Sequence, residues 1–229
     1  GTREPGGNGN YYLGRVTDPW EYRYTDEGNR LDIFNVIPCR ICAVNSIGQV
    51  PGEVQASFRG HTISETGSRA TLEYTKWLWN QLSGDDEHTG YTESRFDDAR
   101  VWDFLTADQI EDVVFLYLQE RGWRVVPSSR SVNKVAFEYY LVEPKGRTAK
   151  VQVKAARGDP LLPSQYERLA GAHDLDHVFL FHALGAGYQD AQSDRVTGIQ
   201  PETLERFMVN YLAMMPGPIA YWTDTILRS

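Results

Sequence analysis

A carboxylate, an amide and two ammonium groups stand at strand-like spacing in the second half of the chain. In "AKVQVKAAR", which begins at Ala149, alternation along a strand places Lys150, Gln152 and Lys154 on one face and apolar residues on the other. Glu138 lies in the preceding strand-like run, fourteen residues before Gln152 (152 − 138 = 14), so the two can meet across one turn. The polar face is either one wall of a site or a solvated surface on which Glu138 pairs with a lysine.

The charge distribution favours an anionic partner for this region. The chain as a whole carries a net charge of −8, which argues against nonspecific nucleic-acid binding by its entire surface. Between residues 121 and 157, however, nine basic residues stand against two acids, a local balance of 9 − 2 = +7. A positive stripe around a few acids is typical of a phosphate-backbone site, and the alternative is a solvated hairpin.

The elements that must position these groups follow from periodicity and capping. Thr106 and Gln109 form a capping-box signature before an apolar helical period that ends at Gly122, and Glu111 lies in this predicted helix as a third candidate acid. Three strand-like runs follow, then the helix "LLPSQYERLAGA", the strand "HVFLFHALG" and the helix "IQPETLERFMVNYLAMM". The order α-β-β-β-α-β-α predicts a mixed α/β (α+β) fold, with a mixed sheet flanked by helices.

The chain is expected to form two domains. Residues 1–95 contain short β-like runs with turn signals, including "LDIFNVIPCRICAVN" and "GQVPGEVQASFRG", before a short helix at "YTKWLWNQL". The polar, acidic segment "SGDDEHTGYTESRFDDAR" reads as a linker or exposed loop. We therefore expect a β-rich N-terminal domain over 1–95 and a second domain over 96–229.

The second domain resembles a known nuclease superfamily in motif and in element order. An acid at Glu138, a Gln-x-Lys at Gln152 and Lys154, and a helix acid at Glu111 resemble the PD-(D/E)xK superfamily, with its restriction-endonuclease-like fold. The likeness is greatest to the Mrr-like branch, in which Gln-x-Lys replaces acid-x-Lys, and it covers about residues 103 to 229. The resemblance implies that these four residues are catalytic. Gln152 is neutral, and Glu138 follows phenylalanine instead of the proline of the family's name.

The resemblance implies an Mg²⁺-dependent (or Mn²⁺-dependent) DNA endonuclease that acts in restriction or defence against foreign DNA. Mg²⁺ prefers oxygen ligands, so Glu138, the amide oxygen of Gln152 and the carbonyl of Val153 are the expected metal ligands. The ion would lower the pKa of the attacking water, while Lys154 would orient that water or stabilise the charge of the transition state. The expected DNA contacts are Lys150, Arg157, Gln165 and Tyr166.

A second reading keeps the nuclease fold without the reaction. An amide oxygen is a weaker metal ligand than a carboxylate, so Gln152 favours a nucleic-acid-binding or assembly module that has lost catalysis. In either case we expect DNA as the partner, and a homodimer or further subunits of a defence system remain open. No apolar run approaches the ~20 residues of a membrane span, and no signal-peptide pattern begins the sequence, so we expect a cytoplasmic protein without a membrane partner.

The N-terminal block offers weaker signals. Its aromatic residues can form an ordinary β core, or they can belong to a module that recognises a nucleic acid or a modified base by stacking. The stretch "VPGEVQASFRGHT" is similar to a loop of a PUA-like barrel, which makes Trp20, Arg59 and His61 candidate contacts.

Three further groups read as structural. Cys39 and Cys42 form a single CxxC in a strand-like run, and zinc would need a second ligand pair, so we expect two reduced cysteines. His173 and His177 straddle a predicted helix end, which favours loop or capping roles over a metal pair. His182, within "FLFHAL", reads as a core histidine with its hydrogen bonds satisfied.

Overall fold

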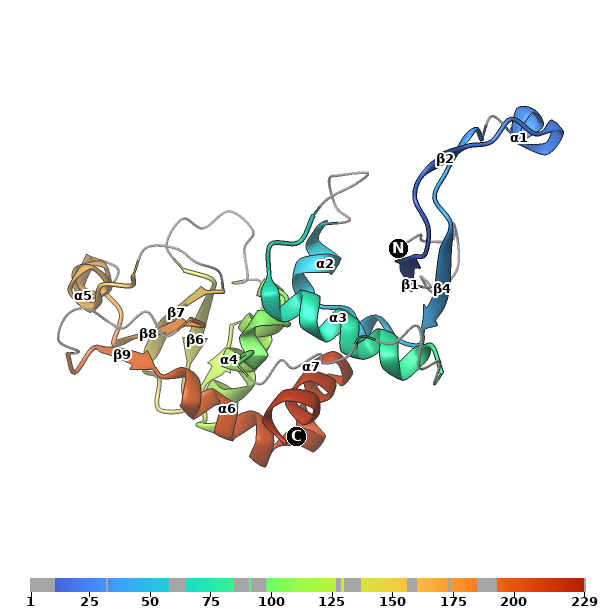
Figure 1. Ribbon diagram of the computed structural model, residues 1–229. Helices are drawn as coiled ribbons and strands as arrows, with labels where there is room; N and C mark the ends of the chain where they lie inside the picture. Colours follow the sequence, from blue (N-terminus) through green and yellow to red (C-terminus); the bar gives the residue numbers. More distant parts are fainter. Residues whose placement is uncertain are drawn as a thin grey trace. The chain divides into compact units, whose positions relative to one another are not determined.

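The chain folds into two compact units. The computed structural model describes residues 11–31, 33–57, 65–84, 91, 98–126, 129, 137–155, 160–172, 174–184 and 193–228 (Figure 1). One unit contains Gly1–Val50 and Thr66–Asp98, and the other contains Pro51–Glu65 and Ala99–Ser229. The main boundary after Asp98 lies close to the expected one after residue 95, but Pro51–Glu65 belongs with the second unit.

The first unit is built around a long two-part hairpin. Strand β1 (Tyr11–Val16) pairs antiparallel with β4 (Cys39–Val44), and further along β2 (Glu21–Tyr22) pairs with β3 (Asn35–Val36). Helix α1 (Asp26–Leu31) connects β2 to β3 at the tip of the hairpin (Figure 1). The rings of Tyr22 and Tyr24 both stack on Phe34, at centroid distances of 5.8 and 6.0 Å.

The expectation of a β-rich first domain is correct only in part. Within "GQVPGEVQASFRG", Ile47–Gln49 forms a 3₁₀ turn and Gly52–Ser57 forms helix α2, so this stretch is helical where it is described, and is no barrel loop. Helix α3 (Arg69–Leu82) begins earlier than the sequence predicted because the Ser68 hydroxyl accepts a hydrogen bond from the Thr71 N–H and caps it. For α3, a local cap therefore overrides the strand-like composition.

A five-stranded mixed sheet forms the centre of the second unit. Its strands are β5 (Arg124–Val125), β6 (Tyr139–Val142), β7 (Thr148–Lys154), β8 (His177–His182) and β9 (Val196–Ile199), in that spatial order. The first three are antiparallel, whereas β7, β8 and β9 are parallel. The sequence predicted the first four strands, although β5 and β6 are shorter than expected, but it missed β9 and assigned its last residue to the following helix.

Helix α4 (Ala107–Glu120) begins at the predicted capping box. The Thr106 hydroxyl accepts from the Gln109 N–H, and Gln109 Oε1 accepts from the Thr106 N–H, at 3.2 and 2.9 Å. These two bonds satisfy backbone donors that the first helical turn leaves unpaired. The predicted apolar positions are buried: Ile110, Val113, Val114, Tyr117 and Leu118.

The two faces of the sheet carry different cores. Helix α4 covers the face of Tyr139, whose hydroxyl donates to the Glu111 carbonyl and whose ring packs edge-on against Phe115. Helix α5 (Pro163–Ala172) packs on β8 and β9 over the opposite face, with a core formed by Phe137, Leu161, Ala170, Leu175, Val178, Leu180 and Val196. Since Gln152 pairs in register with Leu180, the polar residues of β7 lie on the α5 face.

The remaining helices are α6 (Pro201–Asn210) and α7 (Gly217–Trp222), followed by a wide turn over Thr223–Leu227. Helix α6 packs against α4, where Phe207 meets Tyr117 edge-on. None of the helices in the described part of the chain combines the length and apolar character that crossing a membrane would require.

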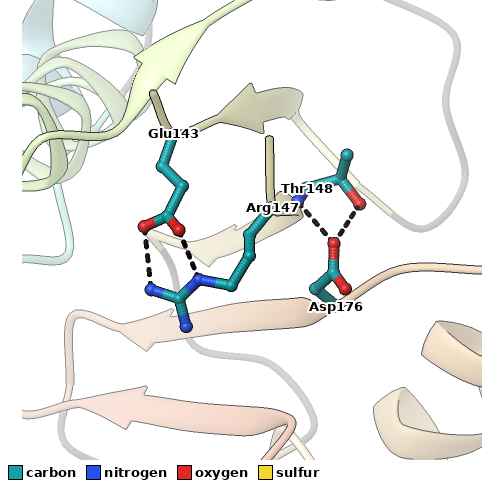
Figure 2. A network of polar contacts seen from close by, with 4 residues as sticks. All are labelled: Glu143, Arg147, Thr148 and Asp176. Atoms are coloured by element: carbon teal, nitrogen blue, oxygen red, sulfur yellow. Dashed lines mark hydrogen bonds and ion pairs between the residues drawn. The ribbon is translucent and has the colours of Figure 1, made fainter. Parts of the chain in front are cut away.

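A polar network clamps the beginning of β7 (Figure 2). The Asp176 carboxylate, just before β8, accepts from both the backbone N–H and the hydroxyl of Thr148, at 2.7 and 3.0 Å. Arg147 forms a two-pronged ion pair with Glu143 across the β6–β7 turn. These bonds hold down the pKa of both carboxyl groups, and they fix the register of β6, β7 and β8.

Candidate functional site

Glu138 and Gln152 meet directly on the α5 face of the sheet. The Glu138 N–H donates to the Val151 carbonyl at 2.8 Å, which extends the β6–β7 ladder by one residue and sets Glu138 opposite Gln152. Gln152 Nε2 donates to Glu138 Oε1 at 3.2 Å and to the Val153 carbonyl at 3.0 Å. The expected approach of these two side chains therefore occurs, through the amide nitrogen.

Burial differs sharply among the residues of this face. Gln152 is 5% exposed, Glu138 is partly exposed, and Lys154 at the end of β7 is exposed. Lys154 and Gln152 are two residues apart in one strand, so both side chains leave the same face. The amide is thus enclosed, while the carboxylate and the ammonium group reach solvent and can meet a large ligand.

Tyr166 and Phe137 border the site. Tyr166 on α5 packs edge-on against the Phe137 ring at 5.9 Å, and burial together with the negative charge of Glu138 raises the pKa of its hydroxyl. The Lys150 ammonium lies 5.0 Å from the Phe137 ring centre, a cation–π distance. Gln165, also on α5, is exposed. Tyr166 therefore lies close enough to Glu138 to sense its charge, while Lys150 lies beside Phe137, the residue before Glu138. Their role as DNA contacts stays a prediction.

Two further expected site residues, Glu111 and Arg157, stay predictions. Glu111 lies on α4, and its carbonyl accepts from Tyr139 at 3.1 Å on the opposite face of the sheet. The Glu111 backbone therefore lies on the side of the sheet opposite Glu138 and Gln152, and its role as a third acid stays a prediction. Arg157 lies outside the described residues.

Strand alternation ends at Glu138. A continuous strand would place Phe137 on the same face as Tyr139. In the structure Phe137 precedes β6 and joins the core beneath α5, on the side of Glu138. The chain departs from the strand here, since a buried pocket of apolar side chains accepts the ring.

The arrangement of oxygens suits a hard divalent cation after one change. Glu138 Oε1 and the Val153 carbonyl both converge on the Gln152 amide, where they accept from its Nε2. Because both neighbours are hydrogen-bond acceptors, the Gln152 amide places its nitrogen between them. A half-turn of the amide would place Oε1 there instead, where it could bind a cation. In the described chain no cluster of three or more His, Cys, Asp or Glu side chains could bind a metal, so such a site depends on the amide and the carbonyl.

The structure adds two residues to the site that sequence reasoning missed: His182 and Arg100. His182 ends β8 in register with Lys154, and it is 2% exposed. Its Nε2 has no hydrogen-bond partner among the described residues, which corrects the expectation of a satisfied core histidine. Arg100 donates from Nη2 to the Ala183 carbonyl at 2.7 Å. For His182 the sequence did offer a signal, because it stands at the carboxyl end of a predicted buried strand, and ligand sites in α/β sheets are commonly found at such strand ends.

The structure describes some of the other candidate residues, and the rest lie outside the described part of the chain. His177 bonds the Thr197 hydroxyl at 2.9 Å, while His173 lies outside the described residues. Cys39 and Cys42 lie in β4 as free thiols. Trp20 is 60% exposed, whereas Arg59 and His61 lie outside the described residues, so base recognition by the first unit stays a prediction.

Comparison with known proteins does not assign a family or a function to this chain. No family model, no curated protein and no solved structure matches this chain. The functional argument therefore depends on the described side chains and on the order of the elements that carry them.

Proposed function

We propose that the second unit is a metal-dependent endonuclease of the PD-(D/E)xK, restriction-endonuclease-like type. Its reaction would be hydrolysis of DNA phosphodiester bonds, in restriction or defence against foreign DNA. The observation that carries the proposal is the contact between Glu138 and Gln152, with Lys154 two residues further along the same strand face. A carboxylate, an amide and an exposed ammonium group thus share one face of a sheet.

The order of the elements supports the same proposal. Helix α4, the antiparallel strands β5, β6 and β7, helix α5 and the parallel strand β8 follow each other in the order expected for this fold. The two helices cover opposite faces of the sheet. Gln152 and Lys154 lie on β7, and Glu138 lies just before β6, the antiparallel neighbour of β7. This agreement goes beyond the short motif, which is itself degenerate.

Glu138, the Val153 carbonyl and the reversed amide of Gln152 would hold the ion. Bound Mg²⁺ would supply an activated water and neutralise charge that builds on the phosphate. The Glu138 carboxylate would contribute the single full negative charge of this ligand set. Lys154 would contact a phosphate oxygen or orient the attacking water. Its side chain is exposed at the carboxyl end of β7, where it can reach a DNA backbone.

The proposal is tested by cleavage assays with two point variants. Glu138→Ala and Lys154→Ala should each abolish Mg²⁺-dependent cleavage, since one removes the carboxylate ligand and the other removes the motif ammonium. Lys154→Ala should leave the melting temperature nearly unchanged, because the side chain is exposed. Lys145→Ala, in the turn before β7, is the matched control and should retain cleavage. Absence of cleavage by the unaltered protein on methylated, unmethylated, single-stranded and RNA substrates would refute the enzyme.

One observation favours a second candidate, a module of this fold that binds nucleic acid without cutting it. The Gln152 nitrogen, and not its oxygen, faces Glu138 and Val153, so two hydrogen bonds must break before the amide can serve as a ligand. Titration calorimetry with Mg²⁺ and Mn²⁺ separates the candidates. Heat of binding that disappears in Glu138→Ala supports the nuclease, whereas DNA binding with no metal binding supports the inactive module.

A further inference from the structure

Three nitrogen donors gather at the carboxyl ends of β7 and β8. Lys154 and His182 end these parallel strands as register partners, so their side chains leave the same face of the sheet from neighbouring positions. Arg100 reaches the same end from the segment before α4, where its guanidinium donates to the Ala183 carbonyl. The Ala183 N–H in turn donates to the Lys154 carbonyl at 2.9 Å, which ties the two strand ends together.

Arg100 is held in place from both ends. Its backbone N–H donates to Asp103 Oδ2 at 2.9 Å, and its Nη2 donates to Ala183. The neighbouring Trp102 is buried, contacts Phe181, and bonds Glu205 through its indole N–H. A guanidinium has five N–H donors in a planar fork, so a group anchored through Nη2 retains donors for an oxyanion. Its position is therefore preorganised.

His182 presents a neutral N–H without an acceptor. Its Nδ1 accepts from the Leu184 N–H at 3.2 Å, which places the ring proton on Nε2. Burial, together with the charges of Lys154 and Arg100, lowers the pKa of the imidazole, so the ring stays neutral at physiological pH. Its Nε2 is buried and has no partner among the described residues. Buried donors are nearly always paired in native proteins, and an unpaired one beside two cations indicates an anionic ligand.

We propose that Lys154, His182 and Arg100 form a phosphate-binding subsite next to Glu138 and Gln152. The donors come from three different segments, which suits a tetrahedral anion with oxygens in several directions better than a planar carboxylate. Lys154 is exposed and Arg100 is partly exposed, so the anion meets these two side chains from solvent. His182 Nε2 is buried, so it bonds the innermost oxygen once the groups that cover it have moved aside. The assignment of that phosphate to a nucleic-acid backbone rests on the proposed function, but the anion site does not.

The subsite also separates negative from positive charge along this face of the sheet. Glu138 is the negative end of the α5 face, and the two cations form its positive end at the strand termini. A phosphate held at the positive end would lie next to Glu138 and Gln152 without competing for those groups. A neutral histidine adds a donor without adding a third charge, which avoids further repulsion between Lys154 and Arg100.

Binding measured in EDTA tests the subsite separately from cleavage. Fluorescence anisotropy with a labelled DNA oligonucleotide should show that Arg100→Ala and His182→Phe each weaken binding about tenfold, the effect of losing one charge-assisted hydrogen bond. Arg100→Ala should also reduce the salt slope by about one, since one phosphate contact by a cation is lost. Arg100→Lys and His182→Gln, which keep a charge or an N–H donor, should retain most of the affinity. Lys145→Ala serves as the exposed control and should change affinity far less.

A direct signal is available even if His182→Phe fails to fold. In ¹⁵N-labelled protein in EDTA, the Nε2–H resonance of His182 should shift when inorganic phosphate is added, and should not shift in Arg100→Ala. Oligonucleotides with and without a 5′-phosphate distinguish a terminal phosphate from a backbone phosphodiester. Unchanged DNA affinity in Arg100→Ala together with an unmoved His182 resonance would overturn the subsite. Failure of the nuclease proposal alone would leave binding in EDTA intact.

Discussion

Gln152 donates a hydrogen bond from its amide nitrogen to the carboxylate of Glu138, 3.2 Å away across β6 and β7. The same nitrogen bonds the Val153 carbonyl, so a hydrogen-bond donor stands where two oxygens converge. Two carboxylates in these positions would repel each other unless a cation joined them, whereas an amide opposite a carboxylate is stable by itself. Gln152 therefore makes the metal-free site stable, at the expense of a weaker ligand for a cation.

Gln152→Glu should make the stability of the second unit depend on divalent cations. Without metal, repulsion from Glu138 and loss of the amide bond should lower the free energy of unfolding by about 1–3 kcal/mol. Saturating Mg²⁺ should restore the stability, because a ligand that binds only the folded state stabilises it by mass action. Thermal unfolding with MgCl₂ or EDTA measures this.

Gln152→Leu is the control for that experiment. It removes the amide without adding charge, so Mg²⁺ should leave its melting temperature unchanged. If Gln152→Glu also shows no response to Mg²⁺, residues 138 and 152 do not share a cation.

Thr106→Ala should lower the free energy of unfolding of the second unit by about 1 kcal/mol, because it removes the acceptor that caps α4. Gln109→Ala removes the reciprocal acceptor and should have a smaller effect. The double variant should be less destabilised than the sum of the two, since each bond supports the geometry of the other. Urea unfolding followed by circular dichroism measures all three, and strictly additive effects would contradict a coupled capping box.

Acid should destabilise the second unit in two steps. Burial, with the charge of Arg147, lowers the pKa of His177 below its usual 6.5 in the folded state. The unfolded chain then binds more protons, so stability falls as pH drops below about 6.5 and continues to fall until the folded-state pKa is reached. The pKa of Asp176 is lowered from 3.8 by its hydrogen bonds from Thr148, so its contribution is present above that pH and is lost below it.

Urea unfolding across this pH range checks both steps. His177→Gln should reduce the slope of stability against pH below about 6.5 without abolishing it, because His182 has a pKa shifted in the same direction. Asp176→Asn should reduce the lower step without affecting the upper one, and part of the lower step should remain because the pKa of Glu143 is also lowered. A His177→Gln profile that superimposes on that of the unaltered protein would contradict the first assignment.

Trp20→Ala tests base recognition by the first unit. Because Trp20 is 60% exposed, its removal should change the free energy of unfolding by less than about 0.5 kcal/mol. If it stacks on a base, binding to DNA with modified bases should weaken by about 1–3 kcal/mol. Leu31→Ala, at a similarly exposed position in the same unit, is the control and should leave binding unchanged. Equal affinities for Trp20→Ala and the unaltered protein would remove Trp20 from any base-stacking role.

Local sequence was sufficient to define the helix and the strand that carry the motif. The capping box at Thr106 and the alternation around Gln152 depend on neighbours a few residues away, and both appear as predicted. The meeting of Glu138 with Gln152 followed from one short turn. The shift of Phe137 and the helix within "GQVPGEVQASFRG" did not follow, because both depend on residues far away in the sequence. Phe137 joins the core beneath α5, and the Gly52 N–H at the start of α2 donates to the Phe104 carbonyl.

The sequence by itself determined which residue types share a face, since alternation and helical period are properties of the local backbone. Tertiary structure alone decided which atom of the Gln152 amide faces Glu138, because that choice depends on acceptors from two strands. It also brought Arg100 to the strand end beside His182, although 82 residues separate them (182 − 100 = 82). Local periodicity cannot predict the contact of Arg100 with the end of β8, because it forms only when the segment before α4 packs there.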